Sequence, residues 1–299
     1  MQTKQRNLMS FHTDDGFRVD ALLITPEFES EEQLYSTPIV LNVHGVLGNF
    51  LARGTPKILP PALMDKGYST LSINTRMGFF GQILGEGIFN DTVLDIEESV
   101  RILQAEGFRN IYILGYSLGA NLAVYFSYKN PDSGIKGLIL EGCSYSLPDS
   151  QKKRLDKWDS IPKYDDIYRR AKIILGGDPD NRKKDQVFIV YRAWGPSFNP
   201  GDIEMFSYRT WWYMRGPEAK YAKTCNIIDK IKLPILFLHG QNDDIVEPSE
   251  PKGLVEILKN SGNQNVQFTF IPGAKHDCME NPDVMIDTIV DWFHRLGHD

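Results

Sequence analysis

Cysteine is scarce in this sequence, and its scarcity argues against two kinds of structure. The 299 residues contain only Cys143, Cys225 and Cys278. An odd and sparse set argues against a disulfide framework and fits a reducing, cytoplasmic environment. The three cysteines also lack the spacing of metal ligands. We therefore expect no disulfide framework, no metal and no other cofactor.

Long apolar runs and long runs of one charge are absent as well. No apolar stretch reaches the roughly 18 residues of a membrane span, and the first residues lack the apolar segment of a secretory signal. The net charge of −6 is spread along the chain without a long single-sign run, so nothing indicates a nucleic-acid partner. These absences favour a cytoplasmic protein that acts on a small molecule, and they leave its oligomeric state open.

Short apolar runs alternate with helical patterns through most of the chain. Such alternation predicts an α/β fold with a mostly parallel sheet and helices on both of its faces. A hairpin is predicted at 6–24. The runs that predict further strands lie at 38–43, 68–73, 111–114, 135–140, 234–238 and 266–271.

The alternation stops between residues 145 and 230. This stretch has helical and irregular character and no clear strand, and 187–194 is too short to assign. Four of the five tryptophans lie in it, namely Trp158, Trp194, Trp211 and Trp212. We interpret residues 145–230 as an inserted, mainly helical cap, and residues 1–144 and 231–299 as the core that carries it.

A G-x-S-x-G pentapeptide joins a predicted strand to a predicted helix: Gly115-Tyr116-Ser117-Leu118-Gly119. This is the pattern of a nucleophile elbow, in which a serine occupies a tight strand-to-helix turn. Side chains at the two glycine positions would collide with neighbouring backbone. Ser117 is therefore the candidate nucleophile, at the N-terminus of a helix whose dipole favours developing negative charge.

A serine hydroxyl needs a base that takes its proton and a carboxylate that orients the base. In elbow hydrolases the chain order is serine, acid, histidine. His276 directly follows the last predicted strand, at the edge of the sheet where Ser117 lies, so we assign it as the base. His239 ends a strand and suits a packing or turn role, while His294 and His298 belong to the last helix or the tail.

The acid is expected in the loop after the strand at 234–238. This loop contains Asp243 and Asp244 side by side, and the Gly-x-x-Asp spacing from Gly240 selects Asp243. Asp244 remains an alternative. Glu141, which ends the preceding predicted strand and reaches the same edge of the sheet, is another.

The tetrahedral intermediate of such a reaction needs two N–H donors aimed at its oxyanion. One is expected from the backbone of Leu118, directly after the nucleophile, and the other from Val46, in the loop after the strand at 38–43. Gly45 allows the backbone to approach closely. We expect the ring of His44 to hold this loop through hydrogen bonds.

Four segments together resemble the α/β-hydrolase superfamily, in its serine esterase, lipase and acyl-hydrolase branch. They are HGVLG at 44–48, GYSLG at 115–119, HGQNDDIV at 239–246 and GAKHD at 273–277, in the family's order. The resemblance implies an α/β-hydrolase fold with Ser117, Asp243 and His276 as triad and Val46 and Leu118 as oxyanion hole. The glycine-rich loop at 78–87 and the cap match no named subfamily.

These features predict a serine hydrolase that cleaves a carboxylic ester with a moderately apolar acyl or alcohol part through an acyl-enzyme. Amide or C–C bond hydrolysis and acyl transfer are alternatives on the same triad, and a non-catalytic binder of small molecules is a third reading. Tyr116, Trp211 and Trp212 are candidate substrate contacts, although cap aromatics also serve packing. Arg76 and Arg209 suit surface salt bridges, or contact with a substrate carboxylate.

Overall fold

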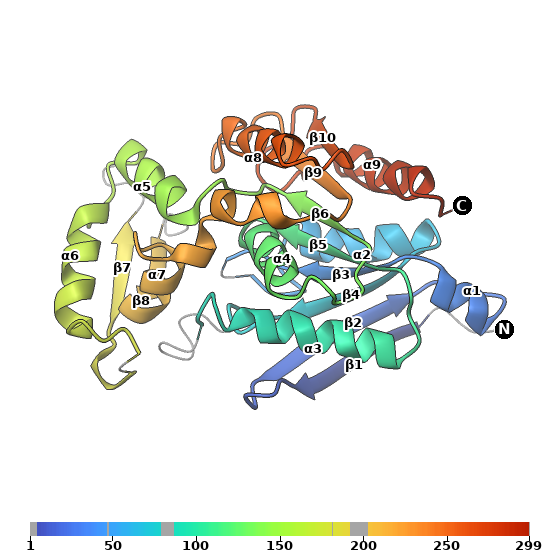
Figure 1. The fold of residues 1–299 in the computed structure, drawn as a ribbon, viewed down its shortest axis with the longest axis horizontal. Coiled ribbons are helices and arrows are strands. Elements are labelled where there is room, and N and C mark those ends of the chain that lie inside the picture. Colours follow the sequence, from blue (N-terminus) through green and yellow to red (C-terminus); the bar gives the residue numbers. More distant parts are fainter. Residues whose placement is uncertain (1–4, 47, 79–86, 181, 192–202, 299) are drawn as a thin grey trace.

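An eight-stranded sheet forms the centre of the computed structural model, which describes residues 5–46, 48–78, 87–180, 182–191 and 203–298 (Figure 1). The strand order is β1-β2-β4-β3-β5-β6-β9-β10. The bounds are β1 (Gln5–His12), β2 (Arg18–Thr25), β3 (Ile39–Val43), β4 (Ser69–Asn74), β5 (Ile111–Tyr116), β6 (Gly137–Glu141), β9 (Ile235–Gly240) and β10 (Val266–Ile271).

The first two strands form the predicted hairpin, and all the strands from β4 to β10 in the sheet order pair in parallel. Gly16 adopts φ +82° in the hairpin turn, a conformation that favours glycine. β2 also pairs antiparallel with β4. The predicted α/β fold with a mostly parallel sheet is confirmed.

Alternate residues of the central strands pack into two separate hydrophobic cores, one on each face of the sheet. Ile111 and Ile113 of β5 join the core with α3 (Thr92–Ala105), α4 (Leu118–Lys129) and α8 (Ser249–Asn260). Tyr112 and Leu114 join the core with α2 (Thr55–Asp65) and α9 (Pro282–Arg295). Successive side chains of a strand point to opposite faces of the sheet, which explains this division. Because helices cover both faces, a ligand can reach the sheet only at the ends of its strands.

Two helices depart from simple sequence rules. α2 begins at Thr55 and continues through Pro60 and Pro61, although proline usually breaks the interior of a helix. No helix is predicted from the sequence at α1 (Glu31–Ser36), whose N-terminus is capped by the Ser30 side chain. With six residues and no buried side chain, α1 carries no apolar periodicity that a sequence pattern would reveal.

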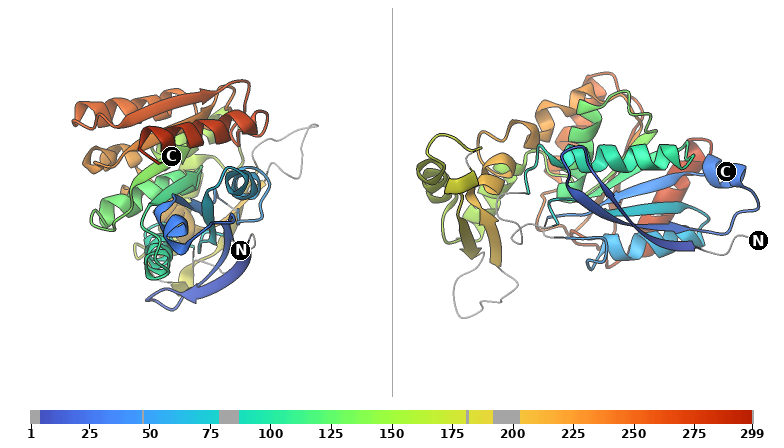
Figure 2. Two further views of the ribbon diagram at one scale, coloured as in Figure 1. Left: turned by 90° about the vertical axis from the view of Figure 1, so that its right-hand side faces the viewer. Right: turned by 90° about the horizontal axis from the view of Figure 1, so that it is seen from below.

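The chain between β6 and β9, which we call the insertion, lies at one end of the sheet, while α9 and the C-terminus extend toward the other end (Figures 1 and 2). It contains α5 (Leu147–Lys157), α6 (Tyr164–Leu175), α7 (Tyr208–Met214) and the short 3-10 helices Arg182–Lys184, Lys220–Ala222, Thr224–Asn226 and Ile228–Lys230. Its division from the core at 145 and 230 stays a prediction.

The insertion also contains two strands that the sequence did not reveal, β7 (Val187–Tyr191) and β8 (Ile203–Ser207), paired antiparallel. Val187 and Ile189 of β7 are exposed while Val190 is buried. The apolar residues thus occupy both faces of β7, and the alternation that identifies a half-buried strand is missing. Within the described residues, no helix is long and apolar enough to cross a bilayer.

Candidate active site

The turn between β5 and α4 has the geometry of a nucleophile elbow. Ser117 adopts φ 54° and ψ −117°, a conformation that non-glycine residues rarely occupy. A Cβ atom at Gly115 would lie 2.2 Å from the carbonyl oxygen of Gly119, and one at Gly119 would lie 2.2 Å from that of Val43. Both glycines are therefore needed for the close packing that holds the serine in this turn.

Three side chains from distant parts of the sequence form one hydrogen-bonded chain at the carboxyl edge of the sheet. His276 Nε2 lies 2.9 Å from Ser117 Oγ, and His276 Nδ1 lies 2.8 Å from Asp243 Oδ2. Asp243 follows β9 and His276 follows β10, whereas Ser117 follows β5. The structure thus brings together the three residues that the sequence proposes, in the arrangement that lets a histidine take a serine proton.

The loop after β9 orients Asp243 and shields it from water. Asp243 Oδ1 accepts hydrogen bonds from the backbone N–H groups of Ile245, at 2.8 Å, and Val246, at 2.9 Å. Burial raises the pKa of Asp243, but the hydrogen bond and charge of His276 and the backbone N–H groups outweigh it, so that the pKa is lowered. Asp244 is exposed, as expected for a solvated turn residue.

The remaining histidines after Ser117 serve other contacts. His239 Nε2 lies 3.1 Å from the carbonyl oxygen of Val246 and 3.6 Å from Asp243 Oδ2, so His239 supports the loop that carries the acid. His294 is exposed. His298 Nε2 lies 2.6 Å from the hydroxyl of Tyr112, which places this tail histidine in a structural contact rather than in solvent.

Glu141, the alternative acid, has a buried carboxyl group that contacts Thr55. It is fully buried, and its Oε1 lies 2.7 Å from Thr55 Oγ1, which in turn lies 3.2 Å from the carbonyl oxygen of Asp277. Burial raises the pKa of Glu141 to about 8, helped by the charges of Asp277 and Asp243 and opposed by the hydrogen bond of Thr55. Its backbone carbonyl accepts the N–H of Ser117 at 2.8 Å.

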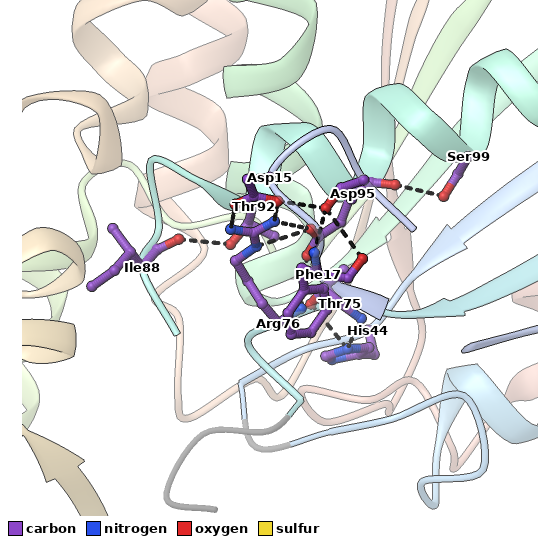
Figure 3. A network of polar contacts seen from close by, with 10 residues as sticks. Asp15, Phe17, His44, Thr75, Arg76, Ile88, Thr92, Asp95 and Ser99 are labelled. Atoms are coloured by element: carbon purple, nitrogen blue, oxygen red, sulfur yellow. Dashed lines mark hydrogen bonds and ion pairs between the residues drawn. The ribbon is translucent and has the colours of Figure 1, made fainter. Parts of the chain in front are cut away.

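The loop after β3 is fixed by the ring of His44, as expected. The N–H of Thr75 donates to His44 Nε2 at 3.1 Å, so Nδ1 carries the proton and donates to the carbonyl oxygen of Gly45 at 2.7 Å. Complete burial lowers the pKa of His44 to about 4. His44 is therefore a neutral structural residue in this loop (Figure 3).

Arg76, next to Thr75, is itself buried and pairs with one exposed and one buried carboxylate, whereas the sequence suggested a surface salt bridge alone. Its guanidinium is 2.7 Å from Asp15 and 2.8 Å from Asp95, and its backbone N–H donates to Asp95 (Figure 3). Burial raises the pKa of Asp95 to about 6, against the attraction of Arg76. Arg209 is also buried; it donates to the carbonyl oxygen of Pro179.

The two predicted oxyanion donors lie beside Ser117. Leu118 is the first residue of α4, so its N–H has no acceptor within the helix. Val46 lines the same cavity as Ser117, and a Cβ atom on its neighbour Gly45 would lie 3.2 Å from Ser117 Cβ. Leu47, part of the same motif, lies outside the described residues, as do residues 79–86 of the glycine-rich loop.

A cavity of about 190 Å³ opens over Ser117, between the core and the insertion. The described residues that line it are Gly45, Val46, Tyr116, Ser117, Ser144, Leu147, Arg154, Trp158, Glu204, Arg215, Ile245 and His276. Tyr116 is thus placed as a substrate contact would be. Trp211 and Trp212 are not in this group: Trp211 is fully buried against Tyr164, and Trp212 stacks on Tyr168.

Gly142 is a residue of the site that sequence reasoning missed. It has φ +59°, and a Cβ atom there would lie 2.8 Å from His276 Cε1. The absence of a side chain at Gly142 thus makes room for the ring of His276. The signal in the sequence was a glycine directly after the Glu141 that ends a predicted strand. Among the described residues, no group of three histidine, cysteine or acidic side chains could hold a metal ion.

Comparisons by sequence find partial matches. The model of the prolyl oligopeptidase family matches residues 185–298, a segment that contains Asp243 and His276 but not Ser117. The 2-succinyl-6-hydroxy-2,4-cyclohexadiene-1-carboxylate synthase of Yersinia pestis is 28% identical over 180 residues, which cover 56% of this chain and 62% of the synthase. The chain thus spans less than two thirds of this relative's length.

Comparisons of structure match nearly the whole chain. An esterase of Pyrococcus furiosus has a TM-score of 0.63 at 16% sequence identity, over 98% of this chain and 91% of the esterase. Est1E from Butyrivibrio proteoclasticus has a TM-score of 0.62 at 18% identity, over 96% of this chain and 99% of Est1E. At such low identity, these similarities show that the chain shares the fold of these proteins.

Proposed function

We propose that this chain, a member of the α/β-hydrolase superfamily, is a serine hydrolase that cleaves a carboxylic ester through an acyl-enzyme. The observation that carries the proposal is the unbroken hydrogen-bonded chain from Ser117 through His276 to the buried Asp243. Ser117 and His276 line one cavity, so a bound ester carbonyl and the serine oxygen would meet there.

In the proposed reaction, His276 Nε2 takes the proton of Ser117 Oγ as the oxygen attacks the ester carbonyl carbon. The imidazolium that forms is stabilised by Asp243, whose two backbone hydrogen bonds keep its carboxylate facing His276 Nδ1. His276 then gives the proton to the leaving alcohol. Water attacks the acyl-enzyme with the same base, and Ser117 is regenerated.

The negative charge of the tetrahedral intermediate would be stabilised by the backbone N–H groups of Val46 and Leu118. Leu118 adds the N-terminus of α4, where the helix dipole favours negative charge. These donors are fixed before the substrate binds, because Gly45 packs on Tyr116 and Ser117. In serine hydrolases, each preorganised donor of this kind lowers the activation free energy by about 3–4 kcal/mol.

Other reactions at an acyl-enzyme are the second candidate, because the family model describes peptidases and the Yersinia relative is named a synthase. Amide hydrolysis, C–C bond hydrolysis and acyl transfer all use the same three side chains. Turnover of an ester with an added alcohol or amine separates them: acylated acceptor in the products indicates transfer, and free acid alone indicates hydrolysis.

We also propose that the insertion acts as a cap over the site and that the protein is cytoplasmic, a location that the sparse cysteines favour.

A fluorophosphonate probe tests the nucleophile. We expect the probe to label the wild-type protein and to leave Ser117→Ala unlabelled. His276→Ala and Asp243→Asn should lower ester hydrolysis by roughly a thousandfold or more. Asp244→Asn, the neighbouring exposed carboxylate, is the matched control and should keep wild-type turnover. Labelling that persists in Ser117→Ala would refute the proposal.

A further inference from the structure

Asp95, a buried carboxylate of α3, holds both the main chain and the side chain of Arg76. Its Oδ2 accepts the backbone N–H of Arg76 at 2.7 Å, and its Oδ1 accepts the guanidinium Nε at 2.9 Å (Figure 3). The side chain of Asp95 is 0% exposed and that of Arg76 is 5% exposed, so little water competes for these hydrogen bonds. Asp15, in the hairpin turn, binds the two terminal nitrogens of the same guanidinium. The backbone just after β4 is therefore fixed at Arg76.

The residue before Arg76 connects this anchor to the loop after β3. The N–H of Thr75 donates to Nε2 of His44 at 3.1 Å (Figure 3), and Nδ1 of His44 donates to the carbonyl oxygen of Gly45 at 2.7 Å. The rigid ring of His44 thus sets the distance between two segments of main chain. Gly78 adds close packing, because a Cβ atom there would lie 3.2 Å from His44 Nε2.

The hydrogen bond from His44 to Gly45 also sets the direction of the Val46 N–H, one of the two proposed oxyanion donors. The carbonyl group of Gly45 and the N–H of Val46 belong to one peptide unit, which is planar and rigid. In a trans peptide unit these two groups point in opposite directions, so the contact that holds the carbonyl oxygen also aims the N–H. The N–H of Gly48 donates to the same carbonyl oxygen at 3.2 Å, which closes the turn.

We infer that Asp95 and Arg76 are positioning residues for the proposed reaction. They hold the peptide unit that carries the Val46 N–H, through the backbone of Thr75 and the ring of His44. This inference rests on the proposed function and adds to it two residues that are not among the described residues lining the cavity. An oxyanion donor is effective only when it is aligned before the charge develops, and a displacement of about 1 Å can lower a rate about a hundredfold.

The kinetics of Asp95→Asn test the inference, with the concentration of active enzyme counted by fluorophosphonate titration so that unfolded molecules are excluded. The Asn side chain keeps an oxygen for the Arg76 N–H but loses the charge that holds the guanidinium. We expect kcat and kcat/KM for p-nitrophenyl acetate to fall equally, by about tenfold to a hundredfold. The loss is smaller than the roughly 100- to 1,000-fold effect of a missing donor, because Asn74 of β4 still accepts the N–H of Phe50.

Glu98→Gln is the matched control on the same helix. Glu98 is buried and pairs with the exposed Arg101, one turn along α3. The substitution removes one carboxylate charge from α3, as Asp95→Asn does, but at a residue whose ion pair stays within the helix. We expect kcat/KM of the wild type in this variant.

A transition-state analogue separates poorer oxyanion binding from a general loss of structure. When Ser117 Oγ adds to the carbonyl carbon of a trifluoromethyl ketone, the serine proton passes to His276 and the ketone oxygen becomes negative. The inhibition constant should therefore rise in Asp95→Asn by about the factor by which kcat/KM falls. A merely structural role lowers the number of active molecules and leaves the inhibition constant unchanged.

The path is tested by a substitution at its other end. His44→Phe keeps a ring but can neither accept the N–H of Thr75 nor donate to Gly45, so it should lower kcat/KM as Asp95→Asn does. If Asp95 acts through His44, the double variant should be within about twofold of His44→Phe alone, the precision with which independent effects combine. Effects of the two substitutions that multiply would overturn the path.

Failure of the inference and failure of the proposed function give different results. Absence of fluorophosphonate labelling in the wild type overturns the proposed function, whereas labelling together with wild-type kcat/KM in Asp95→Asn overturns the inference alone. If labelling occurs but no ester is hydrolysed, the rate constant of labelling replaces kcat/KM, because phosphonylation of the serine also places negative charge on an oxygen. If Asp95→Asn does not fold, Arg76→Lys replaces it. This variant keeps a positive charge but not the bidentate contacts, and it should lower kcat/KM about tenfold.

Discussion

The buried carboxyl group of Glu141 should make the stability of the protein depend on pH in a predictable direction. Thr55 Oγ1 contacts both Glu141 Oε1, at 2.7 Å, and the carbonyl oxygen of Asp277, at 3.2 Å. A hydroxyl group has one proton, and a carbonyl oxygen only accepts. Thr55 therefore donates to Glu141 in the shorter contact, and the carbonyl oxygen of Asp277 lies within reach of the same hydroxyl. The Thr55 hydroxyl thus links the buried Glu141 to the loop next to His276, and burial raises the pKa of Glu141 against this hydrogen bond.

The size of the effect follows from the two pKa values. In the unfolded chain Glu141 has its ordinary pKa of 4.5, and in the folded protein burial raises this pKa to about 8. Below about pH 4.5 both states hold the proton, and the stabilisation is complete. As the pH rises toward 8, the unfolded chain releases the proton while the folded protein retains it, so stability falls by about 1.4 kcal/mol per pH unit. Above about pH 8 the loss is complete.

Chemical denaturation of the wild-type protein and Glu141→Gln at several pH values between 5 and 8 measures this effect. The Gln side chain keeps an oxygen that accepts the Thr55 hydrogen bond, and it does not titrate. We expect the free energy of unfolding of the wild type, relative to that of the variant, to decrease over this range by roughly 3–4 kcal/mol. All other groups titrate in both proteins and cancel in the difference.

Glu280→Gln is the matched control, because Glu280 accepts the N–H of Lys275 at 2.9 Å in the same loop. That hydrogen bond lowers the pKa of Glu280, so its contribution changes below pH 4.5, outside the range measured. The control difference should therefore be flat. A flat difference for Glu141→Gln as well would refute the raised pKa of Glu141. Normal turnover in Asp243→Asn, together with loss of ester hydrolysis in Glu141→Gln, would transfer the role of the acid to Glu141.

Two further tests each compare one substitution with a matched control. Gly142→Ala and Gly262→Ala both place a side chain on a backbone with positive φ, at +59° and +88°, and should each cost about 1 kcal/mol of stability. Only Gly142→Ala meets His276, so it alone should lower kcat more than tenfold, and equal turnover in the two variants would contradict the geometry. Asp95→Asn breaks a buried ion pair with an arginine and should lower the free energy of unfolding by about 3 kcal/mol in a urea titration. Asp287→Asn, in an exposed pair, should leave stability unchanged; equal effects would contradict the role of burial.

The parts of the fold that the sequence predicted are those where geometry allows few residue types. The elbow demands glycine at 115 and 119 because backbone atoms lie 2.2 Å from where their Cβ atoms would be. The parallel strands are buried on both faces, so they appear as continuous apolar runs. Loops at the ends of those runs meet at one edge of the sheet, which made Asp243 and His276 recognisable as partners of Ser117.

The insertion was predicted less well, because its burial does not follow the chemistry of its residues. Arg154 and Arg215 belong to a residue type that is mostly exposed, yet they are buried and line the cavity. Trp211 read as a candidate for the pocket, yet it packs on Tyr164 in the centre of the insertion. Hydrophobic patterning assigns charges to the surface, so it does not identify a buried arginine.

Backbone strain in the described chain is concentrated where the proposed reaction takes place. Of the three described non-glycine residues with positive φ, Ser117 and Cys278 lie in the elbow and in the loop that carries His276. Such conformations cost about 1–3 kcal/mol each and persist only when the surroundings determine them. Around Cys278, which is fully buried, that role falls to Thr55 and Glu141, whose contacts reach the neighbouring Asp277 carbonyl. The loop that carries His276 is thus held from behind by Thr55 and Glu141, so we expect substitutions at these two residues to change kcat without altering the three side chains of the hydrogen-bonded chain.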